Sequence, residues 1–230
     1  MKKVDLNVDI GEGFPYDEAL LEFATSANVC CGEHAGSPEL TLQTVEICRD
    51  HGVRMGAHPG FPDRKNFGRR TPKKTEIDAY AKSVAQQIVT ASSWAEYFKP
   101  HGALYNLASA RGSSSSVFIT SSATVITGVI VTNLPVMLLA GAPITAYLRA
   151  KGMPFISEGF ADRRYMPNST LVPRTEPGAV LEDPGEIKRQ VLELAPKVDS
   201  ICLHGDTPGC LEFAEMVRKT LEDAGYEVGY

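Results

Sequence analysis

Residues 4–13, VDLNVDIGEG, contain a short run of alternating apolar residues that ends in glycines and an acidic side chain. The same arrangement recurs in ANVCCGEHAG (27–36), VRMGAHPG (53–60), YFKPHGAL (97–104), VMLLAGAP (136–143), PFISEGFADR (154–163) and SICLHGDTPG (200–209). A short apolar run bounded by Gly, Pro and polar residues is typical of a strand followed by a turn. The sequence therefore predicts seven strands.

Stretches long enough for a crossover helix separate most of these strands. The clearest are residues 37–51, 73–91, 184–197 and 207–224, and Ser37-Pro38 fits an N-cap followed by proline at the first helical position. Strand and helix in alternation indicate a parallel sheet of the α/β class. A chain of 230 residues suits one domain, which we place at residues 1–230. Residues 107–135 resist assignment, because abundant Ser, Thr and β-branched residues favour helix and strand about equally.

The composition limits the class of partner. The net charge is −5, the basic residues are scattered and no nucleic-acid-binding motif is present, so we expect no nucleic acid partner. The N-terminus lacks the continuous apolar stretch of a signal peptide, and no run of about 20 apolar residues occurs. The five cysteines form an odd set without a CxxC pair. We therefore expect a cytoplasmic protein with reduced thiols and no membrane span.

Charged or imidazole side chains stand at or just after the carboxyl end of every predicted strand except VMLLAGAP. They are Asp9 and Glu12, Glu33 and His34, His58 and Asp63, Lys99 and His101, Glu158, Asp162 and Arg163, and His204 and Asp206. In a closed parallel barrel all strand carboxyl ends lie on one face. These side chains would then converge into one site.

Four of the five histidines are among these strand-end residues, whereas His51 looks like a helix-end residue. An imidazole with an ordinary pKa of about 6.5 exchanges protons near neutrality, and a neighbouring carboxylate can orient it or activate water. The same residues can bind a divalent metal ion, and the sequence does not separate the two uses. For Asp9 and Asp206 the alternative role is helix N-capping. A Cys31 nucleophile activated by His34 is a further alternative.

Several cations are available for an anionic ligand. They are Arg69, Arg70, Lys99, Arg163, Arg164 and Arg174, each with a solvated surface role as the alternative. The chain has no phosphate-binding GxxxxGKS, GxxxxGKT or GxGxxG motif and no GxSxG motif. Neither a common nucleotide site nor a hydrolase nucleophile elbow is therefore predicted from motifs.

Taken in order, several segments of the chain resemble the LamB/YcsF family, whose members are 5-oxoprolinase A subunits. The likeness is carried by DLNVDIGEGF, TSANVCCGEHAGSP, GVRMGAHPGFPD with FGRR, KPHGALYN, SEGFADRRY, LVPRTEPGAV and SICLHGDTPG, which span nearly the whole chain except residues 107–135. The resemblance implies a parallel β/α barrel, seven-stranded and related to the glycoside hydrolase and carbohydrate deacetylase barrels. This agrees with the seven predicted strands.

The resemblance also implies an activity. It is the ATP-coupled opening of the lactam 5-oxoproline to L-glutamate, with ATP as co-substrate and with subunits B and C as partners. Matching positions imply catalytic roles for Asp9, Glu12, His58, His101, His204 and Asp206, and substrate or anion binding by Asn7, His34, Arg70, Lys99, Tyr105, Glu158, Asp162 and Arg163. Two departures stand out: Glu33 replaces a commoner aromatic residue, and the stretch after Asn106 matches poorly.

The resulting hypothesis has three roles: a proton acceptor, a carboxylate that orients it or activates water, and an anion clamp. The proton acceptor is His58 or His101, the carboxylate is Asp9 or Glu12, and the anion clamp is Arg163 or Lys99. A rival is a metal-dependent amide or carbohydrate deacetylase in which Asp9, His58 and His101 hold a divalent ion. A third interpretation is a non-catalytic subunit that binds a small acid.

Overall fold

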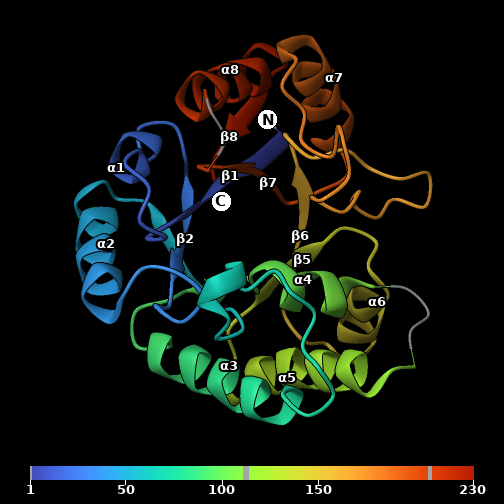
Figure 1. Cartoon of the computed structure of the whole chain (residues 1–230). Coiled ribbons are helices and arrows are strands. Elements are labelled where there is room, and N and C mark those ends of the chain that lie inside the picture. The colour runs from blue at the N-terminus through green and yellow to red at the C-terminus, as the bar shows by residue number, and fades with distance from the viewer. Residues whose placement is uncertain (1, 111–113, 207–208) are drawn as a thin grey trace.

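A closed parallel barrel forms the centre of the molecule (Figure 1). The computed structural model describes residues 2–110, 114–206 and 209–230. In these ranges the barrel strands are β1 (Lys2–Ile10), β2 (Ser26–Cys30), β3 (Arg54–His58), β4 (Tyr97–Phe98), β5 (Val136–Leu139), β6 (Phe155–Phe160) and β7 (Ser200–His204). Successive strands pair in parallel, and β1 pairs with both β2 and β7, which closes the barrel. The expected seven-stranded parallel barrel is confirmed.

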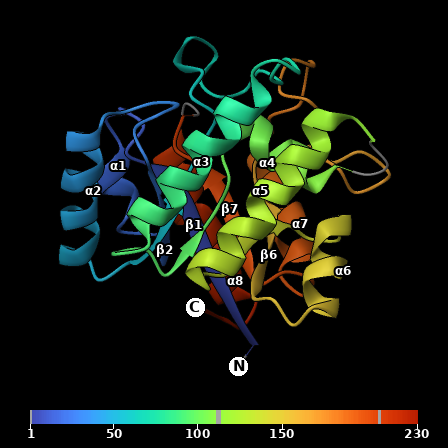
Figure 2. The same ribbon diagram turned by 90° about the horizontal axis from the view of Figure 1, so that it is seen from below.

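Helices surround the barrel on its outer side (Figure 1). They are α1 (Asp17–Leu20), α2 (Pro38–Asp50), α3 (Ile77–Ala91), α4 (Gly102–Ser109), α5 (Ser116–Thr132), α6 (Pro143–Ala150), α7 (Pro184–Leu194) and α8 (Cys210–Asp223), with a 3-10 turn, η1 (Arg64–Asn66), after β3. Figure 2 places both chain ends at one end of the barrel and the long loops after β3 and β6 at the other. No helix within the described ranges is both long enough and apolar enough to cross a membrane.

The four predicted helices correspond to α2, α3, α7 and α8. The Ser37 hydroxyl accepts a hydrogen bond from the Leu40 amide at 3.1 Å, so the predicted cap of α2 is present. The last helix begins at Cys210, later than expected, and residues 207–208 lie outside the described part of the chain. After it, β8 (Tyr226–Val228) pairs with the start of β1 outside the barrel.

The segment whose structure the sequence left open, residues 107–135, is largely helical where it is described. The Ser115 hydroxyl caps α5, and the Ser121 and Thr124 hydroxyls donate to carbonyls four residues earlier. These bonds satisfy the hydroxyl groups inside the helix. α5 lies alongside α3 (Figure 2), so tertiary packing overrides the weak helix propensity of its β-branched residues.

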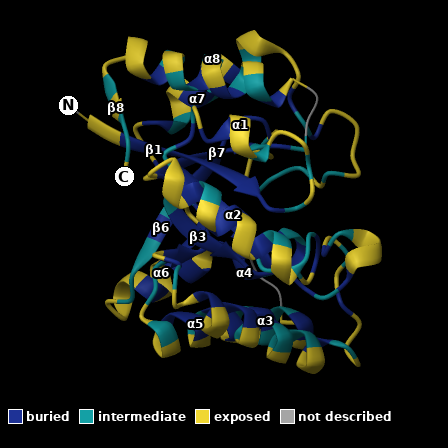
Figure 3. Cartoon of the chain, turned by 90° about the vertical axis from the view of Figure 1, so that its left-hand side faces the viewer, coloured by how far each residue is buried: buried dark blue, intermediate teal, exposed yellow. Residues whose placement is uncertain are grey.

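Strand β1 sends alternate side chains into two different environments. The even-numbered residues Val4, Leu6, Val8 and Ile10 belong to the apolar core between the sheet and the helices. The odd-numbered residues Asp5, Asn7 and Asp9 are buried in the barrel interior, where Asn7 donates to Ser200 at 2.8 Å and accepts from Asn28 at 2.7 Å. Figure 3 shows the buried strands inside a ring of helices with exposed outer faces. The barrel interior is thus polar beside β1, and these polar residues lead up to the site.

Candidate active site

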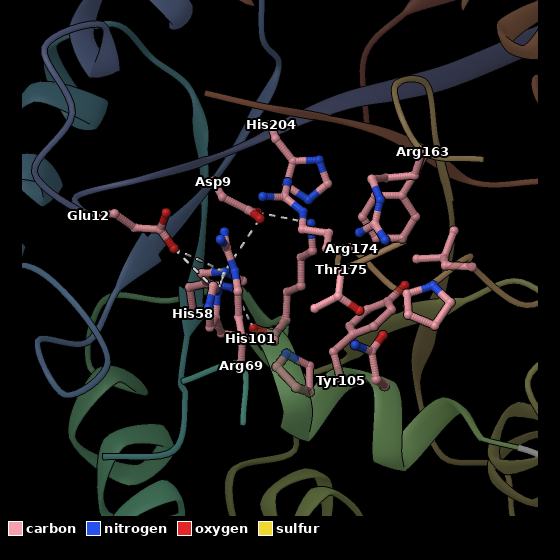
Figure 4. A pocket seen from close by; sticks show the side chains of 17 residues that line it. Asp9, Glu12, His58, Arg69, His101, Tyr105, Arg163, Arg174, Thr175 and His204 are labelled. Atoms are coloured by element: carbon pink, nitrogen blue, oxygen red, sulfur yellow. Dashed lines mark hydrogen bonds and ion pairs between the residues drawn. The ribbon is translucent and has the colours of Figure 1, made fainter. Parts of the chain in front are cut away.

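A cavity of about 280 Å³ lies at the carboxyl ends of the strands (Figure 4). The predicted site residues that line it are Asp9, Glu12, His58, Lys99, His101, Tyr105, Arg163 and His204. Behind them, and bonded to them, are Asn7, His34, Glu158 and Asp162. The closed barrel therefore brings strand-end imidazoles and acids from distant parts of the sequence to one place.

The floor of the cavity is a buried cation between two carboxylates. Lys99 Nζ lies 2.9 Å from Asp9 Oδ1 and 2.8 Å from Glu158 Oε1. Burial alone would lower the pKa of Lys99, but the acidic neighbours, Asp9 first among them, outweigh burial and place the pKa well above its usual range. Burial raises the pKa of Asp9, but His58 and Lys99 outweigh it and hold that pKa well below its usual range. Lys99 and Asp9 are therefore a fixed ion pair.

Two other predicted residues support this floor. The Tyr105 hydroxyl donates to Glu158 Oε2 at 2.7 Å, and burial raises the pKa of both groups. Asn7 Oδ1 accepts from Lys99 Nζ at 3.2 Å. Tyr105 and Asn7 therefore help to position the buried charges of the floor.

One wall of the cavity, which we call the imidazole wall, consists of Glu12, His34, His58 and His101. Glu12 Oε1 lies 3.1 Å from His34 Nε2, 3.3 Å from His101 Nδ1 and 3.8 Å from His58 Nε2. The His34 and His101 rings stack with their centroids 3.8 Å apart. Burial lowers the pKa of His34 to about 3 and that of His58 to about 4, and it raises the pKa of Glu12 to about 7. The imidazoles of this wall are therefore neutral at pH 7.

Two glycines make room for the His34 ring. A Cβ atom at Gly60 would lie 2.4 Å from His34 Nδ1, and one at Gly68 would lie 2.9 Å from His34 Cβ. Gly68 also has a φ of +64°, which favours glycine over other residues. The glycines of AHPG and FGRR are thus part of what assembles the imidazole wall.

The opposite wall, which we call the dyad wall, consists of Asp162 and His204 with Phe160. His204 Nδ1 lies 3.0 Å from both Asp162 carboxylate oxygens, and the Phe160 ring stacks on the imidazole with centroids 5.4 Å apart. Burial raises the pKa of Asp162, but pairing with His204 outweighs burial and holds the pKa below its usual range. An ionised carboxylate only accepts, so Nδ1 carries the proton and Nε2 is left for the cavity. This arrangement suits proton transfer.

Three arginines and one aspartate surround the mouth of the cavity. Asp206 accepts from Arg69 at 2.7 Å and from Arg174 at 2.6 Å. Arg163 instead donates to backbone carbonyls, including that of Val172 at 2.7 Å. Burial, followed by the nearby Arg174, lowers the pKa of Arg163 to about 10. A guanidinium crowded by other cations gains stability from an anionic ligand.

Besides the four residues behind its walls, four more residues expected at the site do not line the cavity: Glu33, Asp63, Arg70 and Asp206. Arg70 pairs with Asp63 at 3.1 Å and with Glu76 at 2.9 Å, and it does not line the cavity. Glu33 does not line the cavity either. The neighbouring Arg69 lines the cavity in place of Arg70, because the Asp63 and Glu76 carboxylates turn the Arg70 side chain away.

The alternative roles considered for single residues do not fit the structure. Asp9 is paired with Lys99, and the N-cap residue of α8 is Gly209, with no side-chain cap, so neither Asp9 nor Asp206 caps a helix. Cys30, rather than Cys31, contacts His34, at 3.4 Å. Burial raises the pKa of Cys31 well above its usual range and that of Cys30 to about 12, so both thiols stay protonated and are poor nucleophiles.

The structure adds residues to the site that the sequence interpretation missed. Arg69 and Arg174 were named as cations but not assigned to the site, and both line the cavity. Asn28 donates to Asp9 at 2.8 Å, and Cys202 Sγ lies 3.0 Å from Lys99 Nζ. A signal for Cys202 was present, because residues two apart on a strand share a face and Cys202 precedes His204 by two.

Comparisons with known proteins show the family of the chain and relatives of its fold. The sequence profile of the LamB/YcsF family matches residues 4–229. A protein of Neisseria meningitidis, named as the A subunit of 5-oxoprolinase, is 40% identical over 99% of each chain. The structure of a lactam utilization protein from Thermus thermophilus is 31% identical, with a TM-score of 0.80 and 99% of both chains covered. The fold is also shared by a family 4 carbohydrate esterase from Streptomyces lividans. That structure is 14% identical, with a TM-score of 0.52, and the match covers 100% of this chain and 92% of that one. The chain belongs to the LamB/YcsF family.

Proposed function

We propose that this chain acts as the A subunit of an ATP-dependent 5-oxoprolinase, a cyclic-amide hydrolase that converts 5-oxo-L-proline to L-glutamate. ATP is the co-substrate and becomes ADP and phosphate, and subunits B and C are the partners. Family membership and the name of the Neisseria relative support this role. The observation in the molecule that carries it is a small cavity in which the imidazole wall faces the dyad wall.

The size and charge of the cavity suit a small acidic lactam. Its volume of about 280 Å³ lies just below the roughly 300 to 1,000 Å³ that is common for ligand sites. Arg163 lines the cavity and offers a guanidinium to the substrate carboxylate. Lys99 is less suited to this role, because its ammonium already lies between two protein carboxylates. We therefore assign the anion clamp to Arg163.

The chemistry explains why ATP is needed. An unstrained five-membered lactam is a poor electrophile, and transfer of the γ-phosphoryl group of ATP to the carbonyl oxygen makes the carbonyl carbon more reactive and releases ADP. Water adds to that carbon, the bond to the ring nitrogen breaks as the nitrogen takes a proton, and a second water hydrolyses the resulting acyl phosphate. One 5-oxoproline, one ATP and two waters thus give one glutamate, one ADP and one phosphate.

The two walls supply the two proton transfers of this scheme. The imidazole wall, together with Asp9, takes the proton of the attacking water, with His58 or His101 as the acceptor. On the dyad wall, His204 delivers a proton to the departing ring nitrogen while Asp162 keeps the ring oriented. Asp206 acts at a distance by holding Arg69 and Arg174 at the mouth.

An assay of ATP-dependent glutamate release from 5-oxoproline tests the proposal. We expect release when this chain, candidate B and C subunits and ATP are all present, and none when this chain is omitted. Full activity of the B and C subunits alone would contradict the proposal. Deacetylation of an N-acetylated sugar without ATP would identify the deacetylase instead. Unchanged turnover with His204→Ala would point to a non-catalytic binding subunit.

A further inference from the structure

One ligand atom from each residue of the imidazole wall lies within 4.8 Å of the corresponding atoms of the other three. Figure 4 shows Glu12 reaching from one side toward the rings of His58 and His101. Because these residues follow three different strands and the loop after β1, the barrel itself produces the convergence. The four ligand atoms therefore lie close enough together to contact a single ion.

Backbone carbonyls fix which nitrogen carries the proton in two of these rings. His58 Nδ1 lies 2.8 Å from the Lys99 carbonyl oxygen, and His101 Nε2 lies 2.9 Å from the Phe67 carbonyl oxygen. A carbonyl oxygen only accepts, so these two nitrogens are the N–H groups. In the neutral rings the remaining nitrogens, His58 Nε2 and His101 Nδ1, therefore both present lone pairs, and they face each other at 2.9 Å.

Two lone pairs at this distance require a positive centre. The Glu12 carboxyl group carries at most one proton, which would serve one nitrogen and leave the others facing acceptors. A divalent cation would take up lone pairs from all of the converging atoms at once. We propose that Glu12, His34, His58 and His101 bind one divalent transition-metal ion.

A second group of possible ligands, Asp9, Cys202 and His204, does not compete for this role. The ammonium of Lys99 lies 2.9 Å from Asp9 Oδ1 and 3.0 Å from Cys202 Sγ, so this group already has its cation. The imidazole wall has no lysine or arginine at hydrogen-bond distance from its converging atoms in the described ranges. The ion is therefore assigned to the imidazole wall.

The ligand chemistry indicates the class of metal. Imidazole nitrogens with one carboxylate oxygen suit Zn²⁺ and neighbouring first-row ions better than Mg²⁺ or Ca²⁺. Ligand histidines commonly donate their other N–H to a backbone carbonyl, as His58 and His101 do here. Such an ion would supply Lewis-acid chemistry at the edge of the cavity. The assignment rests on geometry alone and does not depend on the lactam being the substrate.

Metal titration of the full chain tests the site without any activity measurement. The chain is treated with a chelator, dialysed and titrated with Zn²⁺ in a calorimeter, and with Co²⁺ while visible absorption is recorded. We expect one equivalent of Zn²⁺ per chain and Co²⁺ bands typical of nitrogen and oxygen ligands. Because even outer-shell partners change metal affinity about 10- to 100-fold, we expect Glu12→Gln and His101→Gln each to weaken Zn²⁺ binding at least about 100-fold.

Two histidine variants serve as controls. His51→Gln, at the end of α2, and His204→Gln, on the dyad wall, should bind Zn²⁺ with the affinity of the unmodified chain. Absence of stoichiometric binding, or unchanged binding in both Glu12→Gln and His101→Gln, would overturn the proposal. Loss of Zn²⁺ binding in His204→Gln alone would assign the ion to Asp9, Cys202 and His204 and would also overturn the proposal.

Nitrogen-15 NMR of labelled histidines provides a second measurement. It uses the unmodified chain, so the result does not depend on whether a variant folds. In the metal-free chain we expect the Nδ1–H form of His58 and the Nε2–H form of His101, and on addition of Zn²⁺ we expect large shifts of the two bare nitrogens. A single proton shared by His58 and His101, unaffected by Zn²⁺, would contradict the metal site. Because neither measurement uses glutamate release, failure here is distinguishable from failure of the proposed function.

Discussion

The two walls of the cavity use the same side chain in different surroundings. On the imidazole wall, two of the three rings donate to backbone carbonyls and direct their bare nitrogens at each other and at Glu12. On the dyad wall, the one ring of His204 donates to the ionised carboxylate of Asp162 and leaves Nε2 facing the cavity. Histidine thus stands on both walls, but its ring N–H faces a backbone carbonyl on the imidazole wall and a carboxylate on the dyad wall.

That partner decides what the imidazole can do. A carbonyl oxygen fixes the position of the ring proton but brings no negative charge, so a proton accepted by His58 or His101 is stabilised by the nearby Asp9 and Glu12 instead. A carboxylate stabilises the imidazolium that forms when the ring accepts a proton, so the ring can act as acid and base. The comparison predicts different consequences for changes on the two sides of the cavity.

The largest effect is expected from His204→Ala, which removes the proton-transfer group of the dyad wall. Glutamate formation by the complete mixture should fall by about 10²- to 10⁴-fold, the range typical of general acid–base groups. Single-turnover rates measure this change, and circular dichroism should remain native. Activity close to that of the unmodified chain would mean that the dyad wall takes no part in the reaction.

The next largest effect is expected from Arg163→Met, because its guanidinium faces the cavity on the side of the dyad wall. A hydrogen bond to a charged group is worth about 1.5 to 3 kcal/mol, so KM for 5-oxoproline should rise roughly 10- to 100-fold. The value of kcat should change less, because the carboxylate does not react. A fall in kcat with KM unchanged would place the anion elsewhere, and a melting curve checks the fold.

A smaller effect, on stability, is expected from Asp206→Asn at the mouth. Arg174 and Arg69 hold the pKa of Asp206 below its usual range although burial raises it. The stabilisation is therefore present above the unfolded-state pKa of about 3.9 and is lost as pH falls through the lower folded-state pKa. At pH 7 the variant should be less stable by about 1 to 3 kcal/mol. Denaturant unfolding at several pH values should show the gap closing in acid, and a gap independent of pH would refute the charge pairing.

The smallest effect is expected from Arg70→Gln, the matched control for Arg163→Met. Its pairs with Asp63 and Glu76 are open to solvent, which screens them, so they contribute little to stability. KM for 5-oxoproline should not change. A rise in KM equal to that of Arg163→Met would show that Arg70 reaches the substrate in solution.

The convergence of His58, His101 and His204 could be predicted because it depends only on strand order and on parallel direction. Each residue stands at or just after the end of a strand, and a closed barrel leaves those ends a single face. Side chains at such positions meet whatever the helices between them do. This part of the site follows from the sequence pattern.

The choice between Arg69 and Arg70 could not be predicted in this way. Both follow a turn in which Phe67 and Gly68 have positive φ values of 54° and 64°, and their directions depend on that turn and on distant carboxylates. The segment 107–135 poses a similar difficulty, because packing of α5 (Ser116–Thr132) against α3, rather than local propensity, makes this part of it helical. Strand ends can therefore be read from sequence more readily than loop directions.

The alternation of side chains along β1 divides the strand into two separately adjustable sets. A substitution at Asn7 alters the polar interior beneath the ion pair, whereas one at Val8 alters only the contact with the outer helices. Ligand preference and thermal tolerance can therefore be engineered, or can drift in evolution, at interleaved positions of one strand. An insertion of one residue in β1 would exchange the two sets and damage both properties together.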